Sequence, residues 1–278
     1  MLHCYITEGI LPFGEEVYME ISTFKRYEKK FILTEWQRDK LLAMIDCYMK
    51  PDRYCLNGNS YAINNTYYDT LNNEIIHNSL TSSFYKEKLR LRSYNLLSSP
   101  NDTVFLEIKK KICGVVSKRR AAMKLWEAER FIATGEKPQS KNYLDLQVIN
   151  EIEFFLYRNN VQPKVFITYD RYALFGRDNA DFRLTIDSNI CAKRNAYDFN
   201  IPIIENDLYI MEIKIADSIP LWLSHIISEL EIKRISFSKY GTEYRNHVVA
   251  TASNNSNMEP DLLPDIHLRA IETVLNVG

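Results

Sequence analysis

The segment from Phe84 to Tyr94 (FYKEKLRLRSY) places a basic residue at every second position. Successive side chains of a β-strand point to opposite faces, so all of these cations share one face while Leu89 and Leu91 occupy the other. The cations are Lys86, Lys88, Arg90 and Arg92. A row of like charges must be solvated or meet anions, and phosphate is an anion that Arg binds bidentately and Lys binds as a point charge. The pattern therefore predicts a strand with a phosphate-binding face.

Further segments predict strands, and on most of them charged residues again alternate with apolar ones. These segments are Phe24–Leu33, Tyr61–Asp69, Thr103–Lys111, Val115–Arg120, Val165–Tyr172, Asp181–Asp187 and Leu208–Ile215. Helical periodicity predicts amphipathic helices between and after them. The helices are expected at 34–49, from about Leu125, at 143–157 and at 219–230.

Apolar strand faces covered by helices would turn the charged faces inward, and a closed barrel does this without leaving a bare sheet edge. We therefore predict an α+β fold, an antiparallel β-barrel that forms a tunnel with helices packed on the outside. The alternation fits an open antiparallel sheet with helices on one side and a solvated charged face equally well.

Composition favours one cytoplasmic domain. The 278 residues include only 8 Gly and 9 Pro, with no Ser/Gly-rich or Pro-rich linker, which predicts a single domain. The motifs that carry a family resemblance span Ser22–Tyr244 and imply a domain at 22–244, an N-terminal arm at 1–21 and a tail at 245–278. The tail would belong to the same domain and carry a short helix at 266–275. A net charge of -1 means that any cationic site is local. Five cysteines without metal-ligand spacing and no apolar run of membrane-spanning length predict a cytoplasmic protein.

The ordered set of motifs resembles the VTC-type (polyphosphate polymerase) branch of the triphosphate tunnel metalloenzymes. The motifs are RYEKKF, YYDT, KLRLRSY, FLEIKKK with SKRR, TYDRYAL, FRLTID, MEIK and FSKY, spread over Ser22–Tyr244. Each motif alone has low specificity, whereas their order is specific. The resemblance implies an antiparallel barrel that forms a tunnel.

The resemblance also implies the site residues. The phosphate-binding residues would be Lys30, Arg90, Arg92, Lys109, Arg171, Arg183 and Lys239, and the basic strand adds Lys88. Lys118 or Arg119 would join them, and the spacing does not choose between the two. The catalytic residues would be Arg90, Arg92, Lys109 and Glu212. Glu212, helped by Glu28, would hold Mn²⁺ or Mg²⁺, whereas Glu107 is expected to form an ion pair.

The expected reaction is metal-dependent phosphoryl transfer, most directly polyphosphate synthesis from ATP. Ser236 stands where some polyphosphate-synthesising relatives place a second lysine. The alternatives are hydrolysis of tripolyphosphate or a nucleoside triphosphate, with Glu28 orienting water, and a noncatalytic polyphosphate-binding module. We expect no nucleic-acid partner, because the basic strands lack exposed aromatic stacking on the same face. An integral membrane partner, as in some larger assemblies of this family, remains compatible with the sequence, which does not specify an oligomeric state.

Overall fold

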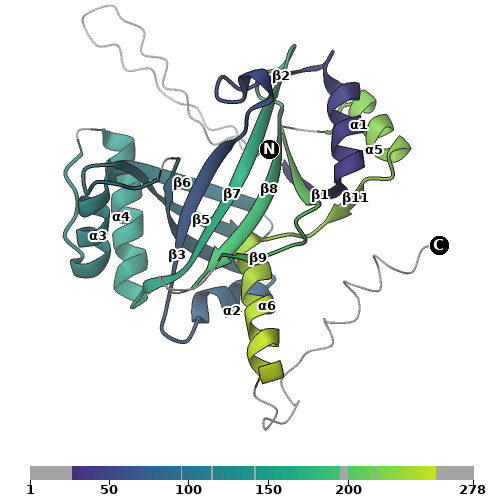
Figure 1. The fold of residues 1–278 in the computed structure, drawn as a ribbon. Helices are drawn as coiled ribbons and strands as arrows, with labels where there is room; N and C mark the ends of the chain where they lie inside the picture. The colour runs from purple at the N-terminus through teal and green to yellow at the C-terminus, as the bar shows by residue number, and fades with distance from the viewer. Residues whose placement is uncertain are drawn as a thin grey trace, which may run out of the picture.

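The computed structural model describes residues 27–94, 96–113, 115–140, 142–194, 200–216 and 218–254. Figure 1 shows one sheet with helices around it. The strands are β1 (Tyr27–Thr34), β2 (Met49–Pro51), β3 (Tyr61–Asp69), β4 (Tyr85–Ser93), β5 (Thr103–Ile112), β6 (Val115–Lys124), β7 (Gln162–Gly176), β8 (Arg183–Lys193), β9 (Ile201–Pro202), β10 (Leu208–Ile215) and β11 (Lys233–Ile235). The helices are α1 (Glu35–Ile45), a 3-10 turn at Leu56–Gly58, α2 (Glu74–Thr81), α3 (Leu125–Thr134), α4 (Tyr143–Arg158), α5 (Leu221–Glu229) and α6 (Lys239–Asn254).

The sheet is antiparallel, in the order β11-β1-β10-β8-β7-β3-β4-β5-β6, with β2 and β9 added beside β7 and β8. This confirms the α+β class, but the predicted closed barrel is wrong, because no ladder joins β6 to β11 among the described residues. β11 has three residues and pairs only with β1 among the described strands. Side chains bridge the opening instead. Lys109 of β5 lies 3.5 Å from Glu28 of β1, which requires a strongly curved sheet.

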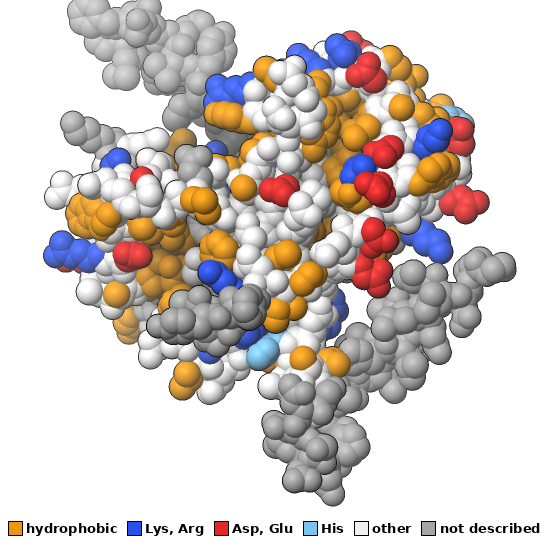
Figure 2. Space-filling model, in the orientation of Figure 1, with side chains coloured by type: hydrophobic (Ala, Val, Ile, Leu, Met, Phe, Trp, Pro, Cys, Tyr) orange, Lys and Arg blue, Asp and Glu red, His pale blue; other side chains and the backbone are white. Residues whose placement is uncertain are grey.

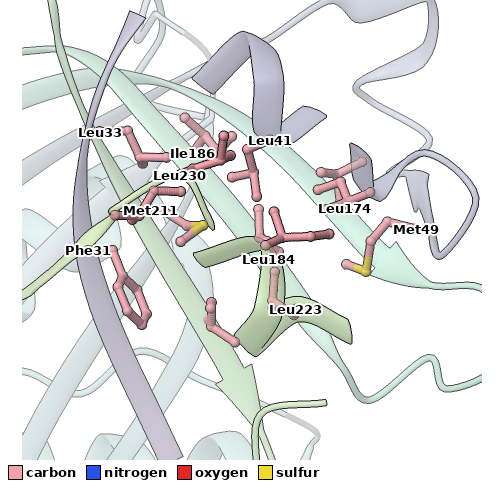
Figure 3. Packing of buried hydrophobic residues seen from close by; sticks show 14 of the residues in the cluster. Phe31, Leu33, Leu41, Met49, Leu174, Leu184, Ile186, Met211, Leu223 and Leu230 are labelled. Carbon is pink, nitrogen blue, oxygen red and sulfur yellow. The ribbon is translucent and has the colours of Figure 1, made fainter. Parts of the chain in front are cut away.

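Two apolar clusters cover the convex side of this curved sheet. In the first, Leu184 and Met211 from β8 and β10 pack against Leu41 of α1 and Leu223 of α5 (Figure 3). The second cluster packs the outward residues of β4, β5 and β6 against α3 and α4, with Phe131 fully buried. These four helices, α1, α3, α4 and α5, lie outside, as predicted, and the charged strand faces are left on the concave side.

A third cluster fills one part of the concave side. Ile63 and Ile167 from β3 and β7 contact Tyr240 of α6 there, and Tyr240 is fully buried. The Tyr240 hydroxyl donates to Asp69 at 2.8 Å, and the second oxygen of Asp69 accepts from the backbone N–H of Ile75 at the start of α2. Asp69 therefore ties α2 and α6 to the end of β3.

Two helices were not predicted. α2 lies in the polar segment 71–83, where Ile75 and Ile76 provide a short apolar face below the length that periodicity detects. α6 crosses the predicted boundary at 244/245 and reaches Asn254. In addition, α1 ends at Ile45 rather than near Met49, because Met49–Pro51 pairs with β7. The predicted arm at 1–21 and helix at 266–275 lie outside the described residues.

Candidate functional site

A cavity of about 1350 Å³ opens on the concave face of the sheet. Fifteen of its lining residues are Lys or Arg and four are Asp or Glu, in a chain whose net charge is -1. On the face drawn in Figure 2, by contrast, basic and acidic side chains are interspersed. The cavity therefore has a local excess of positive charge that the net charge of the chain does not reveal.

All of the predicted phosphate-binding and metal-binding side chains reach this cavity. They are Glu28, Lys30, Lys88, Arg90, Arg92, Lys109, Lys118, Arg171, Arg183, Glu212 and Lys239. The spacing left Lys118 and Arg119 open, and the structure separates them. Lys118 lines the cavity, whereas Arg119 points to the other side of β6 and donates to Glu151 and Gln147 on α4.

Glu107 organises the cations of β4. Its side chain is 1% exposed, and its carboxylate accepts from Arg90 Nε at 2.6 Å and lies 3.0 Å from Lys118 Nζ and 3.8 Å from Arg92. Burial raises the pKa of Glu107, but Arg90, Arg92 and Lys118 outweigh it and hold the pKa well below its usual range. Glu107 is therefore a buried counter-ion.

Hydrogen bonds to neutral side chains fix the two arginines further. Arg90 donates to the Tyr67 hydroxyl at 3.0 Å. Arg92 donates to Asn65 Oδ1 at 3.0 Å and to the Tyr169 hydroxyl at 3.1 Å. These anchors restrict the guanidinium groups to one geometry, which lowers the entropic cost of binding an anion.

Asp187 is a second buried counter-ion on the opposite wall. It is fully buried and binds Arg171 bidentately, at 2.7 and 2.8 Å, and Lys239 Nζ at 2.5 Å. Burial would raise the pKa of Asp187, but the two cations lower it to about 2. Lys239 also lies 4.1 Å from the centre of the Tyr169 ring, so the first turn of α6 is fixed to the sheet.

Two lysines of the cavity have lowered pKa values. Lys88 Nζ donates to Ser238 Oγ at 2.8 Å, and burial together with Lys109 and Lys30 lowers the pKa of Lys88 to about 7. Desolvation and the nearby Arg90 also lower the pKa of Lys118, although part of this side chain is exposed. In the absence of an anion the cavity therefore suppresses part of its own charge, and a bound polyanion would restore it.

Glu28 and Glu212 form a carboxylate pair beside Lys30. Lys30 Nζ lies 3.1 Å from Glu28 and 3.9 Å from Glu212, and Lys214 pairs with Glu212 at 2.7 Å. Burial raises the pKa of each carboxyl, but for both the neighbouring lysines prevail and leave the pKa lowered, so that both are ionised at neutral pH.

This pair fits a hard divalent cation only in part. Carboxylate oxygens are suitable ligands for Mg²⁺ or Mn²⁺, which in phosphoryl-transfer sites use one or two carboxylates completed by phosphate oxygens and waters. No group of three acidic, His or Cys side chains that could hold a metal occurs among the described residues. Glu28 and Glu212 would therefore need the substrate's own oxygens to complete the site.

Several residues of the cavity were not identified from the sequence. Asp187 alternates with Arg183 and Thr185 on β8, and only the pairing of β8 with β7 places it opposite Arg171. The sequence reasoning on aromatic stacking did not identify Tyr61, Tyr94 and Phe105, which line one end of the cavity. Alternation along β5 puts Phe105 on the same face as Lys109, so the position of Phe105 could have been predicted from the sequence.

The fold and this cavity define an α+β domain whose curved antiparallel sheet carries a cavity lined mainly by basic side chains. The chain belongs to the VTC domain family, whose family model matches residues 25–247. No relative among curated proteins matches the chain in sequence.

Two solved structures are similar to the chain in part. A Bacillus halodurans protein described as a candidate adenylate cyclase is 10% identical, with a TM-score of 0.48 over 77% of this chain and 95% of that one. A chain of the Schizosaccharomyces pombe Mediator head module is 10% identical, with a TM-score of 0.37 over 82% of this chain and 94% of that one. The family assignment rests on the family match and not on these structures.

Proposed function

We propose that this protein transfers the γ-phosphoryl group of ATP to inorganic polyphosphate in the concave cavity, with Mn²⁺ or Mg²⁺ as cofactor. The observation that supports this most is the concentration of fifteen basic side chains around one enclosed space in a member of the VTC domain family. A phosphate chain carries about one negative charge per unit, and a cavity with this excess of cations is complementary to it.

Different residues of the cavity would have different roles in phosphoryl transfer. This reaction depends on positioning and charge neutralisation more than on covalent catalysis. Arg90, Arg92 and Arg171, held rigid by Glu107 and Asp187, would bind nonbridging phosphate oxygens in a fixed geometry. Lys88 and Lys109 would follow the chain as point charges.

Glu28 and Glu212 would hold the divalent cation. When bound, that cation would supply charge neutralisation for the phosphoryl group. Lys30, which contacts Glu28 and donates to the Phe237 carbonyl at 2.9 Å, would hold the carboxylate of Glu28 in place.

Hydrolysis of tripolyphosphate or a nucleoside triphosphate is the second candidate. Ser236 lines the cavity where some polyphosphate-synthesising relatives carry a lysine, and the loss of that charge favours a short substrate over a long polymer. In that case Glu28 would orient the attacking water.

The test is an incubation of the purified protein with ATP and Mn²⁺, in which orthophosphate, ADP and polyphosphate are followed together. Equal formation of ADP and chain phosphate supports synthesis. Stoichiometric orthophosphate without polymer supports hydrolysis, and binding without turnover supports a noncatalytic module.

The reaction would take place in the cytoplasm, where ATP is the available donor. No helix in the described part of the chain is long and apolar enough to cross a membrane.

A further inference from the structure

One end of the cavity differs from the rest because aromatic side chains line it. Tyr54, Tyr61, Tyr94 and Phe105 follow one another there, with ring centres 6.0, 6.2 and 5.5 Å apart along the series. Their planes are inclined at 63°, 53° and 74°, so these rings meet at edges and do not cover each other's faces. We call this set the aromatic end.

Two arginines flank the aromatic end. Arg53 lies 4.6 Å from the centre of the Tyr54 ring, and Arg120 lies 4.7 Å from the centre of the Phe105 ring and donates to the Tyr94 hydroxyl at 3.3 Å. Both arginines line the cavity. Planar guanidinium groups and aromatic rings are the surfaces on which nucleobases stack.

The aromatic end continues directly into the row of cations. Tyr94 comes directly after β4. Going back along the chain from Tyr94, every second residue is basic, so the cations extend from Arg92 to Lys86 over roughly 20 Å of strand. The pairing of β4 with β5 sets Phe105 opposite Arg92, and the pairing of β3 with β7 sets Tyr61 opposite Arg171. The rings are thus immediate neighbours of the most firmly held arginines.

The aromatic end is also built rigidly. The loop that carries Tyr54 is tied to β7 by the hydrogen bond from the Asp52 backbone N–H to the Ala173 carbonyl at 2.8 Å. Burial raises the pKa of Tyr61 to about 12, so that its hydroxyl is protonated at neutral pH. Tyr54 itself is 60% exposed, which leaves its ring available to a ligand.

We propose that the aromatic end is a nucleobase subsite, so that the cavity takes a nucleoside triphosphate in one direction, with its base stacked against one of these rings and its phosphates along β4. This rests on the proposed function and goes further by assigning the base, and not only the phosphates, a role in substrate recognition. The γ-phosphate would then lie deepest, toward Lys88 and Lys109, with the carboxylate pair Glu28 and Glu212 beside it.

The test compares three probes by calorimetry, in metal-free buffer at one ionic strength. ATP and ribose 5-triphosphate differ only by the base, and tripolyphosphate reports on the phosphate site alone. Stacking of one base predicts that ATP binds about 5- to 100-fold more tightly than ribose 5-triphosphate. Equal affinities would overturn the subsite.

Two variants locate the effect. Tyr54→Ala and Phe105→Leu should each weaken ATP binding about fivefold or more while leaving ribose 5-triphosphate within about twofold of the wild type. Tyr157→Ala, at a ring that is 88% exposed on α4 outside the cavity, is the matched control and should change neither affinity. A loss shared equally by both ligands would contradict a base-specific role.

The outcomes separate this inference from the function on which it rests. Tight tripolyphosphate binding with no advantage for ATP removes the nucleobase subsite and leaves phosphoryl transfer standing. If none of the three probes binds, the phosphate site fails and the subsite fails with it.

Discussion

Glu107→Gln tests whether the cavity depends on its buried counter-ions. The substitution keeps the size of the side chain but leaves Arg90, Arg92 and Lys118 facing one another without the charge that now lies 2.6 to 3.8 Å from them. Removal of one partner from a buried ion pair costs about 3–5 kcal/mol. For a domain of this size that corresponds to a fall in melting temperature of roughly 6–20 °C.

The assay is thermal unfolding of the variant beside Glu153→Gln. Glu153 pairs with Lys137 on the surface at 3.1 Å, with both side chains nearly half exposed, and such a pair contributes at most about 1 kcal/mol. Added tripolyphosphate should raise the melting temperature of Glu107→Gln more than that of the wild type, because the anion supplies the missing negative charge.

The pH dependence gives an independent check. Because the folded pKa of Glu107 lies below its unfolded value, this residue stabilises the protein above the unfolded pKa, and its contribution is lost as the pH falls through the folded pKa. The gap between wild type and Glu107→Gln should therefore narrow below about pH 4. If Glu107→Gln and the wild type have the same melting temperature at neutral pH, Glu107 is not the counter-ion that holds these cations together.

Further predictions concern turnover and binding. Glu212→Gln should abolish Mn²⁺-dependent turnover while metal-free tripolyphosphate binding stays equal or tightens, and near-normal turnover would assign the metal to another carboxylate. Because Lys88 has a pKa near 7, tripolyphosphate binding at about pH 8 should take up protons and weaken as the pH rises; calorimetric heats that are identical in all buffers would contradict this. Arg183→Ala, at an exposed residue stacked on Phe175, should lower tripolyphosphate affinity about tenfold with no change in melting temperature, and a large loss of stability would make Arg183 structural. Affinity for tripolyphosphate should also fall steeply with added salt, and a flat dependence measured by calorimetry would exclude binding by the cationic cavity.

The sequence was sufficient for the strands and for their charged faces. Leu208–Ile215 was predicted with the boundaries that β10 has, and α1 begins directly after Thr34, whose hydroxyl accepts from the Gln37 backbone N–H. Alternation and capping are local properties, in which each residue's role depends on neighbours two to four positions away. The resemblance named the family from the motifs on those strands, and the family match confirms that family.

Closure of the sheet could not be decided in this way, because it depends on whether two strands far apart in the chain meet. The same alternating pattern occurs in an open curved sheet and in a barrel. β11 has only three residues, and a segment that short has no periodic pattern from which it could be predicted. The choice between Lys118 and Arg119 likewise needed the packing of α4 against β6, which gives Arg119 its partners.

By itself the sequence determined which side chains share a face, and therefore that cations of several strands would gather on one side. The tertiary structure alone decided which cations each buried acid neutralises. Asp187 meets Lys239 across 52 positions of the chain, and Glu107 holds cations from two neighbouring strands. Ion pairing acts through space, over distances of a few ångströms, and only the folded chain brings these charges within that range.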